Sequence, residues 1–422
     1  MSFKGQPYAF ESPAAAVMAM VDALAAEGRA SRTERVALRD ARGRFLAEPA
    51  RLDRDSPPFD TAVMDGYALR IGDFMGQRGE LAIAVRGESM IGHPPPPLAP
   101  GAAMRIATGA AVPSGADAVL PRETLREVME GESPRAIAID ATAIASLRAG
   151  HHIRRQGENA RSGAVALEAG TALHAACIGT LAAIGVAQAL LHARVRVAII
   201  TTGEEIVPPD ARPDAFELRD SNGPAVEAAL ASHAWIEVAW RRHARGEAGE
   251  LDALLQTAAR DCDAVLLTGG ISMGHRDPVR AAVERLGARV IFHGLPQRPG
   301  KPMLGAVARR GDGAPLAIFG LPGNPLSALV TFARIAMPVF ARIGGGRVMP
   351  PCTVRLANPD GQSLPMWWHR LVRLEADGQA TLVPARSSGD VVAGGAGDGF
   401  IEVPPGTDAA SRGPFDFHAW PR

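Results

Sequence analysis

Three short apolar runs in the second half of the chain show no alternation of apolar and polar positions: residues 195–200, 264–267 and 316–319. Runs of this kind predict strands that are buried on both faces, as in a parallel sheet. Four further segments have helical spacing of their apolar residues: 225–232, 249–260, 279–286 and 327–343. The alternation of strands and helices predicts a doubly wound α/β domain with a parallel sheet and right-handed crossovers.

The rest of the chain has other patterns. Residues 367–374 and 381–384 alternate at every second position and predict a small antiparallel β domain in the tail. Residues 13–27 predict a helix, with Ser12 as its N-cap and Gly28 beyond its end, and residues 175–185 predict another. Short apolar runs between Gly and Pro clusters predict a compact all-β module: 81–85, 104–107 and 118–120.

Glycine-bearing loops follow all three predicted parallel strands. Residues 201–205 read TTGEE, Gly269 and Gly270 follow the second strand, and residues 320–327 read GLPGNPLS. Because such loops gather at the carboxyl ends of parallel strands, we expect them to line one pocket. Every doubly wound domain has glycine loops, so one loop alone says little. The recurrence of the pattern is what favours a ligand site.

A turn at residues 297–302, QRPGKP, adds two cations, Arg298 and Lys301. A pocket with both carboxylates and cations suits a phosphorylated ligand with a metal ion. Lys4 and Lys301 are the only lysines in the chain, which favours a specific role for Lys301, although chance also explains one isolated lysine. The chain has neither a dinucleotide-binding G-x-G-x-x-G after a strand nor a Walker A motif.

Composition narrows the function classes. The 422 residues are enough for about two to four domains. The 45 basic and 45 acidic residues cancel, which argues against a nucleic-acid partner or an anionic membrane surface. Cys177, Cys262 and Cys352 lack metal-ligand spacing, so we expect three buried thiols in a reducing cytoplasm. We find neither a signal core nor an apolar stretch of about 20 residues, and we expect a soluble cytoplasmic protein.

Several motifs together identify a family. Asp65-Gly66 alone predicts only a hairpin turn. In combination, the chain resembles the MoeA family of molybdopterin molybdenumtransferases, which is related to the E domain of gephyrin. The motifs follow the family's order over nearly the whole chain: MDGYA at 64–68, ATGAAVP at 107–113, TTGEE at 201–205, GGISMGHRD at 269–277, RPGKP at 298–302 and LPGNPLS at 321–327.

The resemblance implies a four-domain homodimer. A mixed N-terminal domain (1–51 and 150–190) would be interrupted by the inserted β module (52–149) and followed by the doubly wound domain (191–344) and the C-terminal β domain (345–422). The implied substrates are molybdate and adenylylated molybdopterin, with AMP as a product and Mg²⁺ as the cofactor. The implied partners are a MogA-like adenylyltransferase and molybdoenzyme maturation proteins, with no nucleic acid and no membrane.

The resemblance also implies roles for individual residues. Glu205 and Asp277 would be the metal ligands, and with Asp65, Thr108 and Lys301 they would form the catalytic set. Further residues would bind the pterin phosphate and molybdate: Gly269, Gly270, Ser272, Arg298, Pro302, Pro322, Asn324, Ser327, Arg370 and Ser388.

Four positions depart from the family pattern. Glu204 stands where the family usually has Asp, Arg298 stands where it has Lys, Gly246-Glu247 replaces an acidic loop that usually begins with Asp, and residues 274–276 form a variant loop. Three alternatives therefore remain at this stage. They are a stand-alone MogA-like adenylyltransferase, which is about one domain long, a pyrophosphatase of the competence-damage-inducible type, and a non-catalytic scaffold.

Overall fold

The computed structural model describes residues 2–3, 6–28, 32–247, 249–271, 278–347 and 350–421. The chain forms two compact units. The large unit comprises Met1–Glu48, Ala169–Gly179 and Ala187–Arg422, and the small unit comprises Pro49–Glu168 and Thr180–Val186. The finer division into four domains stays a prediction.

A six-stranded sheet forms the centre of the large unit. Its strand order is β18 (Ile236–Ala244), β15 (Val195–Thr202), β19 (Ala264–Thr268), β23 (Pro315–Leu321), β22 (Leu304–Arg309) and β20 (Arg289–His293). The first four strands are mutually parallel, and β19 and β23 are buried along their whole length, which confirms the predicted buried strands.

The sheet is parallel at the three predicted strands but not throughout, because β22 is antiparallel to both of its neighbours. Only a tight turn joins β22 to β23, and Arg310 N–H donates to the Ala314 carbonyl within it. A connection this short permits only antiparallel pairing, because a parallel pair needs a long crossover.

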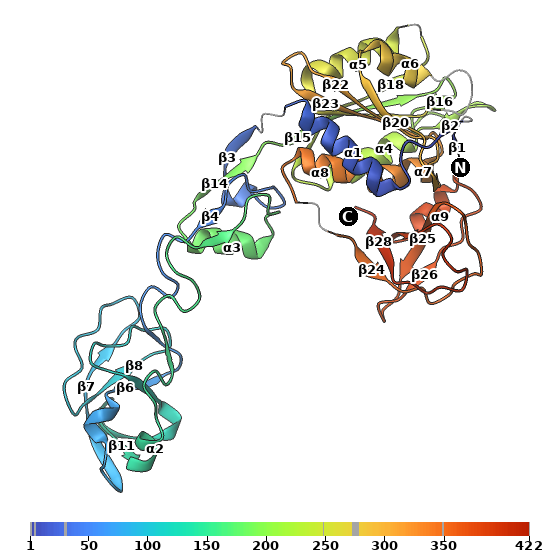
Figure 1. The fold of residues 1–422 in the computed structure, drawn as a ribbon. Coiled ribbons are helices and arrows are strands. Elements are labelled where there is room, and N and C mark those ends of the chain that lie inside the picture. Colours follow the sequence, from blue (N-terminus) through green and yellow to red (C-terminus); the bar gives the residue numbers. More distant parts are fainter. Residues whose placement is uncertain are drawn as a thin grey trace. The chain divides into compact units, whose positions relative to one another are not determined.

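Helices cover both faces of this sheet (Figure 1). Alternate residues of β15 point to opposite faces, so Val197 and Ile199 belong to one core cluster, and Ala198 and Ile200 belong to the other. The first core includes buried residues of α1 (Pro13–Ala26), α4 (Asn222–Ala231), α7 (Pro325–Thr331) and α8 (Met337–Ile343). The second includes residues of α5 (Glu250–Asp261) and α6 (Pro278–Arg285).

The helix Pro325–Ile343 runs through α7, a π-helical turn at Phe332–Ala336 and α8. By length and composition it is apolar enough to cross a membrane, contrary to the prediction that the chain has no such stretch. Of its most apolar window, 61% is buried in the large unit, as is usual for the core helix of a globular protein.

A second sheet in the large unit contains residues of the tail. Its strand order is β21 (Gln297–Arg298), β25 (Trp367–Leu374), β27 (Gly399–Val403), β28 (Phe415–Ala419) and β24 (Cys352–Val354), with β26 (Ala380–Leu382) beside β25. The tail strands pair antiparallel, but β21 joins β25 in parallel. Cys177 and Cys262 are buried as predicted, whereas Cys352 is exposed because it lies on the edge strand β24.

The small unit contains its own six-stranded sheet. The order is β10 (Arg126–Glu130), β11 (Ser133–Asp140), β7 (Glu80–Ser89), β8 (Ala103–Ile106), β6 (Gly66–Leu69) and β9 (Ala118–Pro121). Residues 52–149 were predicted to form an all-β module. The structure agrees except that it also assigns one short α-helix there, α2 (Ala141–Ala145).

The hairpin predicted at Asp65-Gly66 is wrong. Gly66 begins β6, which pairs with β8 and β9 rather than with the strand before the turn, β5 (Thr61–Ala62). A Cβ atom on Gly66 would lie 1.8 Å from the Leu120 carbonyl oxygen. The glycine is therefore required for close strand packing instead of a two-residue turn.

The remaining short elements complete both units. They are β1 (Ser2–Phe3), β2 (Gln6–Pro7), β3 (Thr33–Ala37), β4 (Ala50–Arg51), β12 (Ile153–Arg154), β13 (Val165–Leu167), α3 (Ala175–Ala183), β14 (Gln188–His192), β16 (Ile206–Val207), β17 (Leu218–Arg219) and α9 (Val391–Ala396).

Candidate functional site

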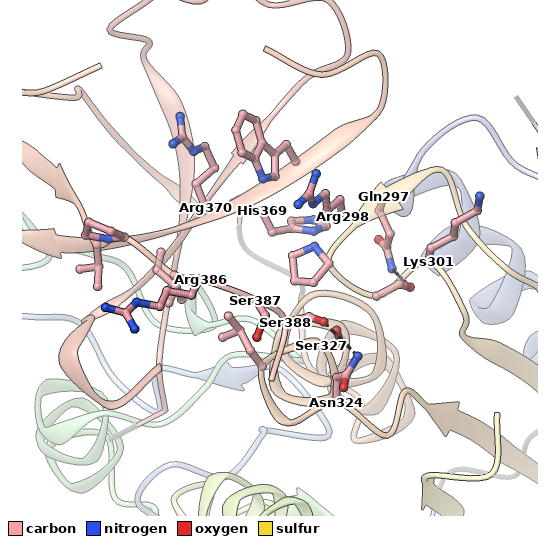
Figure 2. Close-up of a pocket in the computed structure, with 18 of the residues that line it drawn as sticks. Gln297, Arg298, Lys301, Asn324, Ser327, His369, Arg370, Arg386, Ser387 and Ser388 are labelled. Atoms are coloured by element: carbon pink, nitrogen blue, oxygen red, sulfur yellow. Dashed lines mark hydrogen bonds between the residues drawn. The ribbon is translucent and has the colours of Figure 1, made fainter. Parts of the chain in front are cut away.

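A pocket of about 830 Å³ lies within the large unit (Figure 2). Three parts of the chain line it: the turn at residues 297–302, the loop and first helical turn at 322–327, and residues 358–388 of the C-terminal β segment. Both sheets of the large unit therefore contribute to one pocket.

The turn at 297–302 is fixed against the core from two sides. Gln297 is fully buried, and its Nε2 donates to the Gly300 carbonyl at 3.0 Å. Gly300 has a φ of +90°, and a Cβ atom there would lie 2.1 Å from the Cγ2 atom of Thr331. Only glycine allows this approach to the long helix. The turn consequently holds the backbone of Arg298 and Lys301 in a defined position at the pocket wall.

The two cations of this turn have little electrostatic compensation. Arg298 is exposed and Lys301 is half-buried. Within the part of the chain that the structure describes, neither side chain forms an ion pair, and the Lys301 ammonium lies 5.9 Å from the ring centroid of Tyr8. Cations without a carboxylate partner leave a positive potential in the pocket.

Hydroxyl groups line the same pocket as these cations. Ser327 belongs to α7 and is buried, with 3% of its surface exposed. Asn324 Nδ2 donates to Ser388 Oγ at 2.9 Å, and Leu326 N–H donates to the Ser388 carbonyl at 3.1 Å. These bonds join the loop after β23 to the C-terminal β segment and place Ser327, Ser387 and Ser388 together (Figure 2).

Residues 386–390 form a loop that presents a further cation. Asp390 accepts hydrogen bonds from the backbone N–H groups of Arg386 and Ala393 at 3.1 and 3.0 Å. These bonds, the one from Ala393 first, lower the pKa of Asp390 and fix the start of α9. The loop therefore displays the Arg386 side chain and two serines toward solvent in the pocket.

Arg370 differs from the other pocket cations because it has a partner. Its Nη1 donates to Asp360 Oδ1 at 2.8 Å, and its Nη2 donates to Asp360 Oδ2. The guanidinium also lies over the Trp368 ring, 4.0 Å from the centroid. Hydrogen bonds from Arg370 lower the pKa of Asp360, even though partial burial opposes this shift.

A buried cluster lies behind the pocket wall. Glu402 of β27 accepts from Arg334 Nη2 at 3.0 Å and pairs with His369 Nε2 at 3.1 Å. Burial alone raises the pKa of Glu402, but hydrogen bonds from His369 and Arg334 outweigh it and lower this pKa well below 4.5. Burial lowers the pKa of His369, which stays neutral at pH 7. The cluster ties the long helix to the C-terminal sheet.

The pocket brings together eight of the residues predicted from sequence. They are Arg298, Lys301, Pro302, Pro322, Asn324, Ser327, Arg370 and Ser388. Sequence reasoning missed Asp360, Trp368, Arg386 and Ser387. The sequence RSSGD at 386–390, with a cation, two hydroxyls and a turn, was a signal for Arg386 and Ser387. Nothing in the sequence shows that Asp360 reaches Arg370.

The other predicted residues lie elsewhere. Gly269, Gly270 and Glu205 follow β19 and β15 and do not line the pocket, so only one of the three predicted loops does. The reason is that the C-terminal β segment covers the loop after β23, at one side of the row of strands. Gly269 still lies close to that loop, since a Cβ on Gly323 would be 3.7 Å from its Cα.

Two predicted residues, Ser272 and Asp277, lie outside the described residues. Asp65 and Thr108 belong to the small unit, where Asp65 Oδ1 accepts from both the N–H and the hydroxyl of Thr108 at 2.7 Å. These two bonds lower the pKa of Asp65. The carboxylate is therefore ionised and fixed in orientation at neutral pH.

The predicted metal ligands fit Mg²⁺ only in part. Among the residues that the structure describes, no group of three or more His, Cys, Asp and Glu side chains could hold a metal ion. Glu205 is exposed, and no ion pair within the same residues occupies its carboxylate. A single accessible carboxylate suits Mg²⁺, which is usually held by one or two carboxylates with substrate phosphates and water.

His418 provides a test of the C-terminal sheet's electrostatics. It stacks on Phe400 with a centroid distance of 5.0 Å, and burial lowers its pKa to about 4. The unfolded chain binds a proton below its ordinary pKa of 6.5, and the folded chain does so only near 4. Stability is consequently full above pH 6.5 and falls as the pH decreases toward 4, by about 1.4 kcal/mol per pH unit.

We expect His418→Phe to reduce this pH dependence, because phenylalanine keeps the stacking and cannot bind a proton. The measurement is the free energy of urea unfolding at pH 7.5 and pH 5.0 for the wild type and the variant. His93→Phe, at an exposed position of the small unit, is the matched control and should behave as the wild type. If His418→Phe lost as much stability between pH 7.5 and pH 5.0 as the wild type does, His418 would not be the source of the pH dependence.

Comparison with known proteins adds independent findings. Residues 12–185 match the family model "MoeA N-terminal region (domain I and II)", and residues 198–342 match "Probable molybdopterin binding domain". The chain is 35% identical over 332 residues to a molybdopterin molybdenumtransferase of Nostoc sp., which covers 78% of this chain and 73% of the relative. A second, from Synechococcus elongatus, is 33% identical over 364 residues, or 84% of this chain and 86% of the relative.

A solved structure supports the same assignment. The crystal structure of a molybdopterin biosynthesis MoeA protein from Pyrococcus horikosii superposes with a TM-score of 0.73. Its sequence is 27% identical, and the match covers 96% of this chain and 98% of that one.

Proposed function

The chain belongs to the MoeA family of molybdopterin molybdenumtransferases, and from this premise we propose how its pocket acts in molybdenum cofactor biosynthesis. We propose that the pocket binds molybdate for insertion into adenylylated molybdopterin. The observation that carries this proposal is that Arg298 and Lys301, which form no ion pair among the described residues, line the same pocket as the hydroxyls of Ser327 and Ser388.

Molybdate is a tetrahedral dianion, so a site for it needs positive charge and hydrogen-bond donors around one point. Lys301 supplies an ammonium with three donors, and Arg298 supplies a second charge on the same stiff turn. Ser327 is buried, and Asn324 holds Ser388, so both hydroxyls have restricted positions. These hydroxyls would bind the oxyanion with little reorganisation of their own.

The adenylylated substrate requires charge neutralisation at its phosphates. We propose that Glu205 and Asp277 hold Mg²⁺ there, and that the ion neutralises phosphate charge when the anhydride bond to AMP is cleaved. Glycine loops at the carboxyl ends of β15 and β19 allow the ligand to approach the backbone closely. Molybdenum then exchanges oxygen ligands for the dithiolene sulfurs of the pterin, a step in which the protein mainly positions the reactants.

We propose further that the enzyme is a cytoplasmic homodimer and that each active cleft uses residues of both subunits. The Asp65 carboxylate is ionised and is held by two hydrogen bonds from Thr108. A subunit contact would give this pair a role at the phosphates. The substrate would come from a MogA-like adenylyltransferase, and the product would pass to molybdoenzyme maturation proteins.

The first expected outcome concerns the reaction itself. Purified enzyme with adenylylated molybdopterin should release AMP only when molybdate and Mg²⁺ are both present, because cleavage and insertion are coupled. AMP release is measured by chromatography with and without each component, and with EDTA. Equal AMP release without molybdate would indicate a pyrophosphatase, and no release under any condition would indicate a scaffold.

The second concerns Lys301. We expect Lys301→Arg to fold normally but to need much more molybdate for half-maximal AMP release, since the planar guanidinium cannot replace the compact ammonium. Loss of one charge-assisted contact of about 1.5 to 3 kcal/mol corresponds to roughly a 10- to 150-fold weakening. Arg298→Lys is the control, because it keeps the charge at an exposed position. An unchanged molybdate dependence of Lys301→Arg would refute the assigned contact.

The third tests the shared cleft. Asp65→Ala and Asp277→Ala should each be inactive alone, whereas a mixture should regain activity because heterodimers contain one intact site. Subunit exchange is verified by two affinity tags, and AMP release is then measured in the doubly tagged fraction. Activity that stays absent after verified exchange would show that each cleft belongs to one subunit.

A further inference from the structure

Four cations line the pocket, and their ionic partners differ. Across the residues that the structure describes, Arg298, Lys301 and Arg386 form no ion pair, whereas Arg370 is paired with Asp360 through two parallel hydrogen bonds. Both members of this pair line the pocket. The Arg370 side chain is 14% exposed and that of Asp360 is 32% exposed, so solvent screens their interaction only in part.

The carboxylate of Asp360 is held in place as well as charged. Gln362 N–H donates to Asp360 Oδ1 at 3.2 Å within the same turn. The Trp368 ring packs against the guanidinium group of Arg370, with its centroid 4.0 Å from the guanidinium carbon. Two bonds, a fixed acceptor and an aromatic support therefore define one orientation of the Arg370 fork.

This orientation does not serve the rest of the pocket. Figure 2 shows the Arg370 guanidinium directed away from Ser327 and Ser388, where the proposed oxyanion contacts lie. The end-on pair of N–H groups that Asp360 occupies is also the pair that matches two oxygens of a tetrahedral oxyanion. One pair of donors cannot serve both acceptors at once.

We propose that Asp360 is an affinity-determining residue that occupies the oxyanion-binding face of Arg370. An oxyanion engages the end-on Nη1 and Nη2 donors of Arg370 only by displacing the Asp360 carboxylate, and the cost of this exchange lowers the affinity of the pocket for every tetrahedral dianion that binds there. The inference rests on the proposed molybdate pocket and deepens it. A residue that only oriented Arg370 for binding would raise the affinity for the oxyanion, whereas Asp360 in this proposal lowers it.

The test is direct binding of molybdate alone to the purified full chain, followed by isothermal titration calorimetry at fixed ionic strength. Asp360→Asn keeps the shape and one acceptor but removes the charge and the bidentate pair. We expect this variant to bind molybdate roughly 5- to 20-fold tighter than the wild type.

Two comparisons separate the proposed role from other effects. Asp377→Asn is the matched control: Asp377 accepts from Gln379 N–H at 2.9 Å in a similar turn and does not line the pocket. It should leave molybdate affinity unchanged. In an Arg370→Gln background, Asp360→Asn should no longer improve binding, because the displaced contact is already absent.

Each result has a distinct meaning. Binding by the wild type with equal or weaker binding by Asp360→Asn would overturn the inference and leave the pocket assignment intact. An equal gain in the Arg370→Gln background would also overturn it, since the effect would then be general charge repulsion. Absence of molybdate binding by both wild type and Asp360→Asn would overturn the proposed pocket, and the inference with it. Thermal unfolding of each variant confirms that it is folded.

Discussion

The pocket depends on the attachment of the C-terminal sheet to the long helix Pro325–Ile343. Arg334 of that helix and Glu402 of β27 form an ion pair with two hydrogen bonds in which both side chains are almost fully buried, and His369 adds a third hydrogen bond to the carboxylate. Removing one partner of such a pair typically costs about 3 to 5 kcal/mol, because a charge is left buried. This cluster, the bonds from Asn324 and Leu326 to Ser388, and the pairing of β21 with β25 hold the binding groups on the C-terminal side relative to the α/β sheet.

Two opposite electrostatic environments lie on the two sides of β25. His369 faces a cluster where burial suppresses its protonation, and charge is balanced by the Arg334 and Glu402 pair. Its neighbours in sequence, Trp368 and Arg370, line the pocket, where cations exceed carboxylates. His369 also contributes to the pocket lining, but its side chain is fully buried, so the charge-balanced cluster lies directly behind the binding surface.

Sequence patterns were sufficient where local chemistry decides the structure. The unbroken apolar runs at β15, β19 and β23 gave buried parallel strands, and Ser12 gave the start of α1, where its side chain accepts from Ala15 N–H at 3.1 Å. The cation turn and Ser327 were also found as parts of one pocket. These features depend on hydrophobic periodicity, caps and short motifs, all of which are visible over a few residues.

Other features required long-range packing that no short pattern records. Gly66 resembles a turn glycine, but the Leu120 carbonyl of a neighbouring strand explains it. Cysteine is a residue type that is usually buried, but Cys352 is exposed because it lies on the edge strand of a sheet. Asp360 lies ten positions before Arg370 in an ordinary turn, and their pairing emerges only from the path of the intervening chain. Placement of Gly269, Gly270 and Glu205 outside the pocket likewise follows from where the C-terminal β segment covers the sheet.

The parallel pairing of β21 with β25 has a consequence for motion of the C-terminal sheet. Gln297 and Arg298 belong to the C-terminal sheet through their pairing with Trp367 and Trp368, while the same turn is pressed against Thr331 of the core helix. A rigid swing of the C-terminal sheet would have to break this backbone pairing or pull the turn off the helix. A hinge motion of the C-terminal sheet against the α/β sheet is therefore opposed by backbone hydrogen bonds as well as by side-chain contacts.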